Sequence, residues 1–255
     1  MARNGFKILD CDLHICEPID LWQRYMLPKF RDDAPVGRPL EHRPFHDLNM
    51  LHRGETYSPY GRFDSTIEDE EAGFVHLARL HGRYEQFCEF QKRGWGPDTQ
   101  IEAMDIEGID AAMLFPSLAL TAMGKEYDAD GLAADVAHAY NDWMAEFCAY
   151  SSERLLGAGI LMPQAIDEAI TEVRRARREL GFKAVVIRPN PVCGRNWHDP
   201  AYEPLWAACE EEELLVGFHE GIPCLLPHGV AQRFDGRYED DWMTDHVARH
   251  PHEMQ

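Results

Sequence analysis

Short apolar segments alternate along the chain with segments of helical periodicity, and this alternation limits the fold more than any other sequence feature. The apolar segments, each long enough for one strand, are residues 6–13, 109–116, 155–162, 183–188 and 214–218. Between them, apolar positions recur with helical spacing over residues 98–107, 130–152, 166–180 and 201–213. Strands that alternate with helices of about ten or more residues are typical of βαβ units, which assemble into a parallel sheet. We therefore expect an α/β fold built on five parallel strands.

Residues 30–97 interrupt this pattern. They are rich in proline, glycine, histidine and arginine, and their apolar residues follow no sustained period. An irregular stretch this long within a compact domain is typical of a functional insertion, a lid or an oligomer arm. We predict one domain over residues 1–255 that carries an irregular insertion at about residues 30–97.

The charge balance argues against two classes of partner. The chain has 45 Asp and Glu residues against 25 Lys and Arg residues, which gives a formal net charge of −20. Nucleic acids and anionic membranes attract proteins with a basic face, so we expect neither as a partner. A small-molecule substrate remains the expected partner.

The apolar runs and the cysteines indicate the compartment. No apolar run approaches the roughly 18 residues of a membrane span, and none near the N-terminus has the length of a signal peptide. The seven cysteines include no C-x-x-C pair, which favours free thiols in a reducing environment. We predict a cytoplasmic protein.

Polar side chains stand at the end of the first predicted strand. Because strand residues alternate between faces, Asp10, Asp12 and His14 are expected on one face. In a parallel α/β sheet or barrel the carboxyl ends of the strands carry the active site. Three polar groups buried there without partners would each cost free energy. A divalent cation is an efficient partner, because carboxylate oxygen and imidazole nitrogen are both zinc ligands.

Further polar residues follow the later strands. His219 comes directly after the fifth strand, and Arg188 and Asn190 follow the fourth. A lone histidine is more often a core residue than a ligand, but the position of His219 matches that of His14 on the first strand. For Arg188 two interpretations remain open: a salt bridge to a helix, or a clamp for a substrate carboxylate. The second and third strands end without a chemically active side chain.

Covalent catalysis finds little support. The sequence has no G-x-S-x-G, G-x-x-x-x-G-K-[ST], H-E-x-x-H or G-x-G-x-x-G motif. Cys11 and Cys16 flank the polar residues of the first strand, but a thiol among several carboxylates is a poor nucleophile. We interpret both cysteines as packing residues.

The segment DCDLHICEPIDLW, residues 10–22, resembles the opening of the amidohydrolase 2 branch of the amidohydrolase superfamily. That branch includes the aminocarboxymuconate-semialdehyde decarboxylases and related aromatic-acid decarboxylases. Similar stretches lie at residues 181–191, 194–200, 204–206, 216–221 and 250–255. The resemblance runs from residue 6 to the last residue, more loosely across the insertion.

The resemblance implies a distorted (β/α)8 TIM barrel with one divalent metal ion, most often zinc and in some members manganese. The superfamily's first-strand H-x-H matches Asp12-x-His14, and its strand-five histidine ligand matches His219. An aspartate in place of the first histidine shifts the preference toward harder ions such as manganese. Substrate contacts are expected at Arg188, Asn190 and Asn196.

The implied enzyme acts on a small carboxylated or carbonyl-bearing, aromatic-derived substrate, with the metal ion as Lewis acid or activator of water. Hydrolysis and non-oxidative decarboxylation share such a site, and the sequence does not choose between them. The family analogy and the long insertion are consistent with a homodimer.

Two functional positions of the branch have no counterpart in the sequence. The strand-six acid/base region and the aspartate after strand eight would both fall beyond Gln255. Five βα units cannot close an eight-stranded barrel, so we expect a C-terminally truncated fragment of a longer enzyme. The alternative is a catalytically inactive fragment or a non-catalytic binding protein that lacks the strand-eight aspartate.

Overall fold

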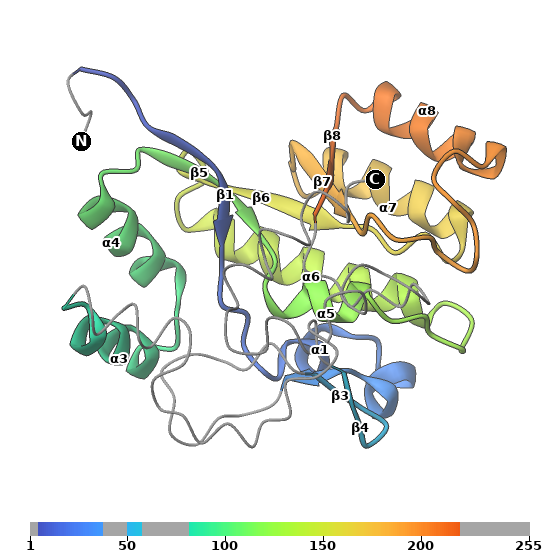
Figure 1. The fold of residues 1–255 in the computed structure, drawn as a ribbon, viewed down its shortest axis with the longest axis horizontal. Helices are drawn as coiled ribbons and strands as arrows, with labels where there is room; N and C mark the ends of the chain where they lie inside the picture. The colour runs from blue at the N-terminus through green and yellow to red at the C-terminus, as the bar shows by residue number, and fades with distance from the viewer. Residues whose placement is uncertain (1–4, 38–49, 58–81, 220–255) are drawn as a thin grey trace, which may run out of the picture.

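A parallel sheet of five strands forms the centre of the molecule (Figure 1). The computed structural model describes residues 5–37, 50–57 and 82–219. The strands lie in the order β1-β5-β6-β7-β8, and every neighbouring pair is parallel. Their bounds are β1 Leu9–His14, β5 Ala111–Phe115, β6 Leu155–Ile160, β7 Ala184–Ile187 and β8 Leu215–Phe218. The predicted α/β fold with five parallel strands is confirmed.

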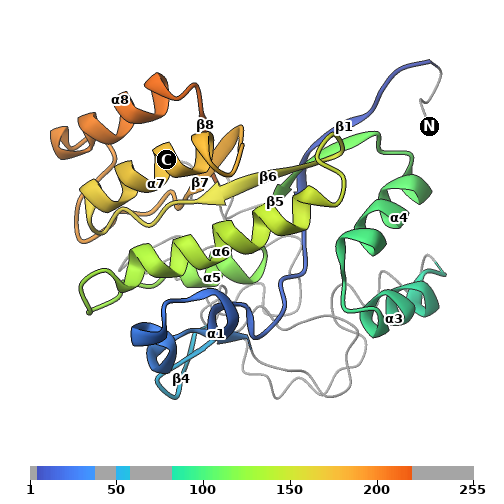
Figure 2. The same cartoon turned by 180° about the vertical axis from the view of Figure 1, so that it is seen from behind.

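Helices connect neighbouring strands of this sheet. Their bounds are α4 Pro97–Glu107, α5 Leu118–Met123, α6 Leu132–Ala149, α7 Ile166–Arg178 and α8 Glu203–Glu211, with the short 3-10 helix η2 at Pro200–Tyr202. α6 packs against β6, and α7 packs against α8 (Figure 2). α4 begins at Pro97, whose missing N–H is not needed at a helix start. It is followed by Gly108, whose φ of 77° is natural for glycine.

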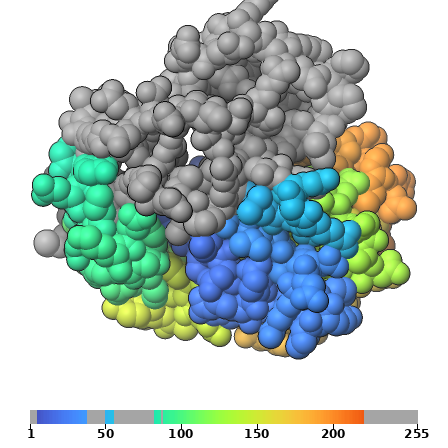
Figure 3. All heavy atoms as spheres, turned by 90° about the horizontal axis from the view of Figure 1, so that it is seen from below, coloured from blue at the N-terminus to red at the C-terminus, as the bar shows by residue number. Residues whose placement is uncertain are grey.

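Short elements lie in and just before the region where the sequence showed no period. They are α1 Leu21–Tyr25, the 3-10 helix η1 Pro28–Asp33, the antiparallel strands β2 Val36–Gly37, β3 Met50–His52 and β4 Glu55–Tyr57, and α3 Tyr84–Lys92. The region around η1 and the β3–β4 hairpin lie side by side (Figure 3), where Arg53 Nε donates to Asp33 Oδ1 at 2.6 Å. Strands of two or three residues are too short to show a period. Residues 38–49 and 58–81 of the predicted insertion lie outside the described part of the chain.

The apolar core lies between the sheet and α6. Trp22 of α1 is fully buried in it, and its Nε1–H donates to the Val136 carbonyl at 3.2 Å. Tyr140 and Met144 of α6 and Leu114 of β5 are equally buried. Among the residues that the structure describes, no helix is both long and apolar enough to cross a bilayer.

A buried polar network joins α6 and α7 to the end of β6. Asn141 Oδ1 accepts from the Ile160 N–H at 2.7 Å, and its Nδ2 donates to the Ile160 carbonyl at 3.1 Å. Asn141 Nδ2 also donates to Glu172, whose carboxylate binds Arg175 and lies 2.9 Å from His138 Nε2. Each buried member therefore has a partner, as a polar group in a dry environment requires.

His138 should make the stability of the protein depend on pH. Its hydrogen bond to Glu172 raises the pKa of His138 above the ordinary value of 6.5, although burial opposes this rise. The folded protein thus holds the proton more tightly than the unfolded chain, so the stabilisation is complete below pH 6.5 and is lost as the pH rises through the raised pKa. The free energy of unfolding, measured by urea titration across this pH range, should fall more steeply with rising pH for the wild type than for His138→Gln. Equal slopes for the two proteins would contradict this assignment.

Candidate metal centre

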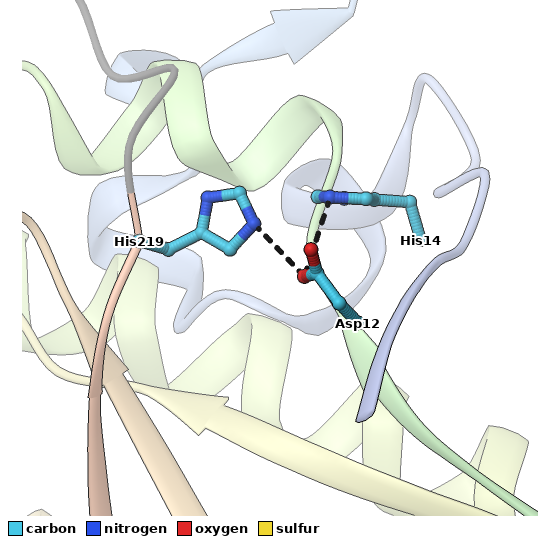
Figure 4. Close-up of side chains that lie close together, drawn as sticks. All are labelled: Asp12, His14 and His219. Atoms are coloured by element: carbon cyan, nitrogen blue, oxygen red, sulfur yellow. Dashed lines mark ion pairs between the residues drawn. The ribbon is translucent and has the colours of Figure 1, made fainter. Parts of the chain in front are cut away.

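The carboxyl ends of β1 and β8 meet although these strands lie at opposite edges of the five-stranded sheet. In a flat sheet, four spacings of about 4.8 Å would hold them roughly 19 Å apart. Instead, Asp12 and His14 of β1 and His219, directly after β8, place their ligand atoms within 4.8 Å of one another (Figure 4). The sheet is therefore curled into part of a barrel, with these three side chains facing one another across it.

The three side chains form a compact cluster with Asp12 in the middle. His219 Nε2 lies 3.3 Å from Asp12 Oδ1, and His14 Nε2 lies 3.9 Å from the same oxygen. The two imidazole rings meet edge to face, with their centroids 4.8 Å apart. The side chain of His219 is 13% exposed, that of His14 39% and that of Asp12 70%. The cluster is therefore open to solvent on the carboxylate side and walled on the His219 side.

A hydrogen bond fixes the ring of His14. Its Nδ1 lies 2.7 Å from the carbonyl oxygen of Pro116, at the end of β5. Since a carbonyl can only accept, Nδ1 is the donor, and in the neutral ring Nε2, the nitrogen facing Asp12, is the atom with the lone pair that a metal ion needs. The sequence predicted no chemically active side chain at the end of this strand. Its contribution is a backbone oxygen, that of Pro116, which orients a candidate ligand.

β1 carries a bulge that displaces one of the expected residues. The pairing of β1 with β5 shifts by one residue between Asp10 and Leu13, so β1 holds an extra residue there. A bulge breaks the strict alternation of faces. The Asp12 N–H donates to Asp10 Oδ1 at 2.9 Å, so the Asp10 carboxylate closes a turn within its own strand. The expectation that Asp10 shares the face of Asp12 and His14 is therefore wrong.

The donor set fits a divalent cation. Ligands about 2.1 Å from a tetrahedral ion lie roughly 3.4 Å apart, close to the 3.3 Å and 3.9 Å found here. One carboxylate oxygen and two imidazole nitrogens suit zinc and also manganese. Three protein ligands leave positions open for a substrate oxygen or water. Among the described residues this is the one such cluster of histidine, cysteine and acidic side chains.

The three residues predicted to contact the substrate differ in their burial. Arg188 is buried, and its guanidinium donates to Glu126 Oε1 at 2.8 Å and to main-chain carbonyls at the end of α5. Glu126 lies between α5 and α6 rather than on a helix, so this ion pair is not the predicted salt bridge to a helix, and the role of Arg188 as a substrate contact stays a prediction. Asn190 is half-buried two residues later, and Asn196 is exposed beyond a tight turn. Their roles as substrate contacts stay predictions.

Two residues near the cluster were missed by sequence reasoning. Phe115 of β5 packs against both imidazoles, with centroid distances of 5.3 Å to His219 and 6.4 Å to His14. Glu17 is buried three residues after His14 and binds the start of α5. An acid between apolar neighbours just beyond a strand was the available signal for Glu17. Phe115 gave none, because an aromatic residue is ordinary in a buried strand.

Comparison with curated proteins identifies two decarboxylases among the relatives. The 2-amino-3-carboxymuconate-6-semialdehyde decarboxylase of Dictyostelium discoideum is 30% identical over 134 residues, which is 52% of this chain and 36% of the relative. A gamma-resorcylate decarboxylase of Rhizobium radiobacter is 32% identical over 131 residues, 49% of this chain and 39% of the relative. The chain thus spans between a third and two fifths of the length of these curated relatives.

Solved structures share the fold. An amidohydrolase from Mycobacterium avium subsp. paratuberculosis K-10 matches 98% of this chain and 66% of its own, with a TM-score of 0.65 and 20% identity. A dihydroxybenzoic acid decarboxylase from Polaromonas sp. JS666, with bound manganese and 2-nitroresorcinol, matches 91% of this chain and 53% of its own, with a TM-score of 0.56 and 17% identity. These likenesses support the predicted barrel architecture, of which the curled five-stranded sheet is a part.

The family assignment rests on the match along the chain. The amidohydrolase family profile matches residues 9–254, from the first residue of β1 almost to the last residue of the sequence. This range includes the bulged strand end, the buried Trp22 and the histidine after β8, which carried the resemblance in the sequence. The chain therefore belongs to the amidohydrolase family.

Proposed function

We propose that this protein acts as a metal-dependent carboxy-lyase that removes carbon dioxide from a small aromatic or aromatic-derived carboxylate. The observation that carries the proposal is the convergence of Asp12, His14 and His219 at the carboxyl end of the curled sheet. The four curated relatives that match at 30–33% identity are all named decarboxylases, which favours decarboxylation over hydrolysis.

The three side chains would hold one divalent cation. When bound there, the cation supplies Lewis acidity that polarises a substrate oxygen. Asp12 contributes negative charge, His219 a nearly buried imidazole, and His14 a lone pair aimed by the Pro116 carbonyl. Zinc is the ion that sequence reasoning favours, and the hard Asp12 oxygen supports manganese as the alternative.

Phe115 would form the apolar side of the same site. Its ring lies against both histidines and offers a flat surface to an aromatic substrate. An apolar wall also excludes water from the carbon that loses its carboxylate. In the reaction, the bond from that carbon to the carboxylate breaks, carbon dioxide leaves, and a proton takes its place. Asn190 and Asn196 are the proposed polar contacts to the substrate.

Release of carbon dioxide tests the proposed reaction. We expect metal-dependent release from at least one member of a panel of hydroxybenzoates and carboxylated semialdehydes, including 2,6-dihydroxybenzoate. Esters, lactones and amides offered under the same conditions should not be hydrolysed. An Asp12→Asn variant, which lacks one ionised ligand, should lose the activity. Metal-dependent hydrolysis without release of carbon dioxide would contradict the proposal, as would turnover that survives removal of the metal.

A further inference from the structure

A short buried helix crosses the carboxyl side of the sheet and is bound at both ends by charged side chains. α5 has six residues, Leu118–Met123, and all of them are buried. At about 1.5 Å per residue it is roughly 9 Å long. The Ser117 side chain makes no hydrogen bond to the start of the helix, and at the other end the Gly124 N–H donates to helix carbonyls but not to that of Met123. Its free N–H and carbonyl groups therefore need partners from elsewhere in the fold.

Glu17 supplies the partner at the N-terminal end of α5. Its Oε1 accepts from the N–H groups of Ser117 and Ala119, both at 3.0 Å, and its Oε2 accepts from the Leu118 N–H at 2.9 Å. The residue is only 1% exposed. Burial raises the pKa of Glu17, and the three backbone hydrogen bonds oppose this rise. Since both oxygens accept N–H donors, the ionised carboxylate is the form that satisfies all three.

Arg188 supplies the partner at the C-terminal end. Its Nη1 donates to the carbonyls of Met123 and Gly124 at 3.2 Å and 3.0 Å. Its Nη2 donates to Glu126 Oε1 at 2.8 Å and to the Pro191 carbonyl at 2.6 Å. A carboxylate at the positive end of a helix and a guanidinium at its negative end both match the helix dipole.

Both capping residues are continuous with the candidate metal ligands. Glu17 lies three residues after His14, and the Pro116 carbonyl that orients His14 belongs to the residue before the capped Ser117. Arg188 directly follows Ile187, whose carbonyl accepts from the His219 N–H at 3.2 Å. The path from Glu17 through α5 to Arg188 thus joins the backbone that carries His14 to the backbone that carries His219.

We propose that Glu17, α5 and Arg188 form a brace that sets the distance and orientation of His14 and His219 for metal binding. In this proposal, which rests on the proposed metal-dependent function, Glu17 and Arg188 are positioning residues that do not touch the cation. The brace explains why the Arg188 guanidinium, just after β7, is buried against the end of α5. It also explains why an acid is buried beside β1.

Conservative variants of the full chain separate positioning from stability. Glu17→Gln keeps the size of the side chain but places an NH2 group, itself a donor, against backbone N–H donors. Arg188→Lys keeps the positive charge but loses the two guanidinium NH2 groups that donate in different directions. Glu172→Gln is the matched control, because Glu172 is also a buried, hydrogen-bonded carboxylate but contacts α6 and α7 rather than α5. Thermal unfolding without metal, Mn²⁺ affinity by titration calorimetry, and the His14 ring protons by NMR are measured for each.

The brace predicts a loss of Mn²⁺ affinity of about 10–100-fold in Glu17→Gln and Arg188→Lys, at temperatures where both are folded. It also predicts that metal-free Glu17→Gln no longer keeps the proton of His14 on Nδ1 alone. Glu172→Gln should lose stability and keep both its Mn²⁺ affinity and the His14 signal.

Wild-type Mn²⁺ affinity and an unchanged His14 signal in the folded brace variants would overturn the proposal. Failure of both variants to fold would also overturn it, by assigning the two residues to stability alone. If the wild type itself binds no Mn²⁺, the proposed function fails. The His14 signal in metal-free protein then still decides on the brace, because that measurement needs no cation.

Discussion

Replacing His219 with alanine is expected to abolish retention of the divalent cation. His219 contributes one of three ligand atoms, and it is the most buried of the three side chains. Its loss leaves Asp12 and His14, whose side chains are both more exposed. The distance from Asp12 Oδ1 to His14 Nε2 is 3.9 Å. Two ligands open to water compete poorly with the hydration of the ion. Metal content measured after gel filtration should fall from one equivalent per chain to background.

A second histidine provides the control for this experiment. His198 is exposed in the segment between β7 and α8, outside the cluster. His198→Ala should retain the full metal equivalent and unfold at the same temperature as the wild type. Retention of a full equivalent by His219→Ala would refute the assignment of His219 as a ligand. Equal loss in both variants would point to surface binding.

Replacing Trp22 with alanine is expected to cause the largest loss of stability. Trp22 of α1 is fully buried, and its Nε1–H donates to the Val136 carbonyl of α6. Removal of a buried indole leaves a large cavity, and such changes typically cost about 3–5 kcal/mol. The free energy of unfolding should fall by that amount in urea titrations. A loss within about 0.5 kcal/mol would show that the site is not packed as described.

The Trp22→Phe variant separates the packing from the hydrogen bond. Phenylalanine keeps most of the apolar surface but cannot donate to the Val136 carbonyl. We expect it to cost about 1–2 kcal/mol, much less than alanine. Trp22 belongs to the motif that carried the family resemblance, yet it lies in the core rather than in the metal cluster. A loss of metal affinity in stably folded Trp22→Phe would contradict this purely structural role.

The strands and the positions of two candidate ligands followed from the sequence because local patterns determine them. Apolar runs located all five strands, and the parallel arrangement placed His14 and His219 at the same end of the sheet. A shared end of the sheet does not by itself bring the two histidines into contact, because β1 and β8 are the outermost strands of the sheet. The curl that brings them together is a property of the whole barrel, and only the family resemblance predicted it.

Long-range partners were the part that the sequence could not provide. Arg188 was recognised as a cation at a strand end, but its contacts with the end of α5 and with Glu126 join residues more than 60 positions apart in the chain. α5 was not predicted, because a six-residue helix that is buried on all sides shows no amphipathic period. The Asp10 carboxylate was misplaced for a local reason, since a one-residue bulge cannot be read from alternation alone.

Anomalous diffraction from a crystal of the protein grown with Mn²⁺ is the most direct test of the metal centre. We predict one strong anomalous peak, at about 2.0–2.3 Å from a carboxylate oxygen of Asp12, Nε2 of His14 and Nε2 of His219. The Nδ1 of His14 should remain bonded to the Pro116 carbonyl. A peak elsewhere, or no peak among these three side chains at saturating Mn²⁺, would contradict the account.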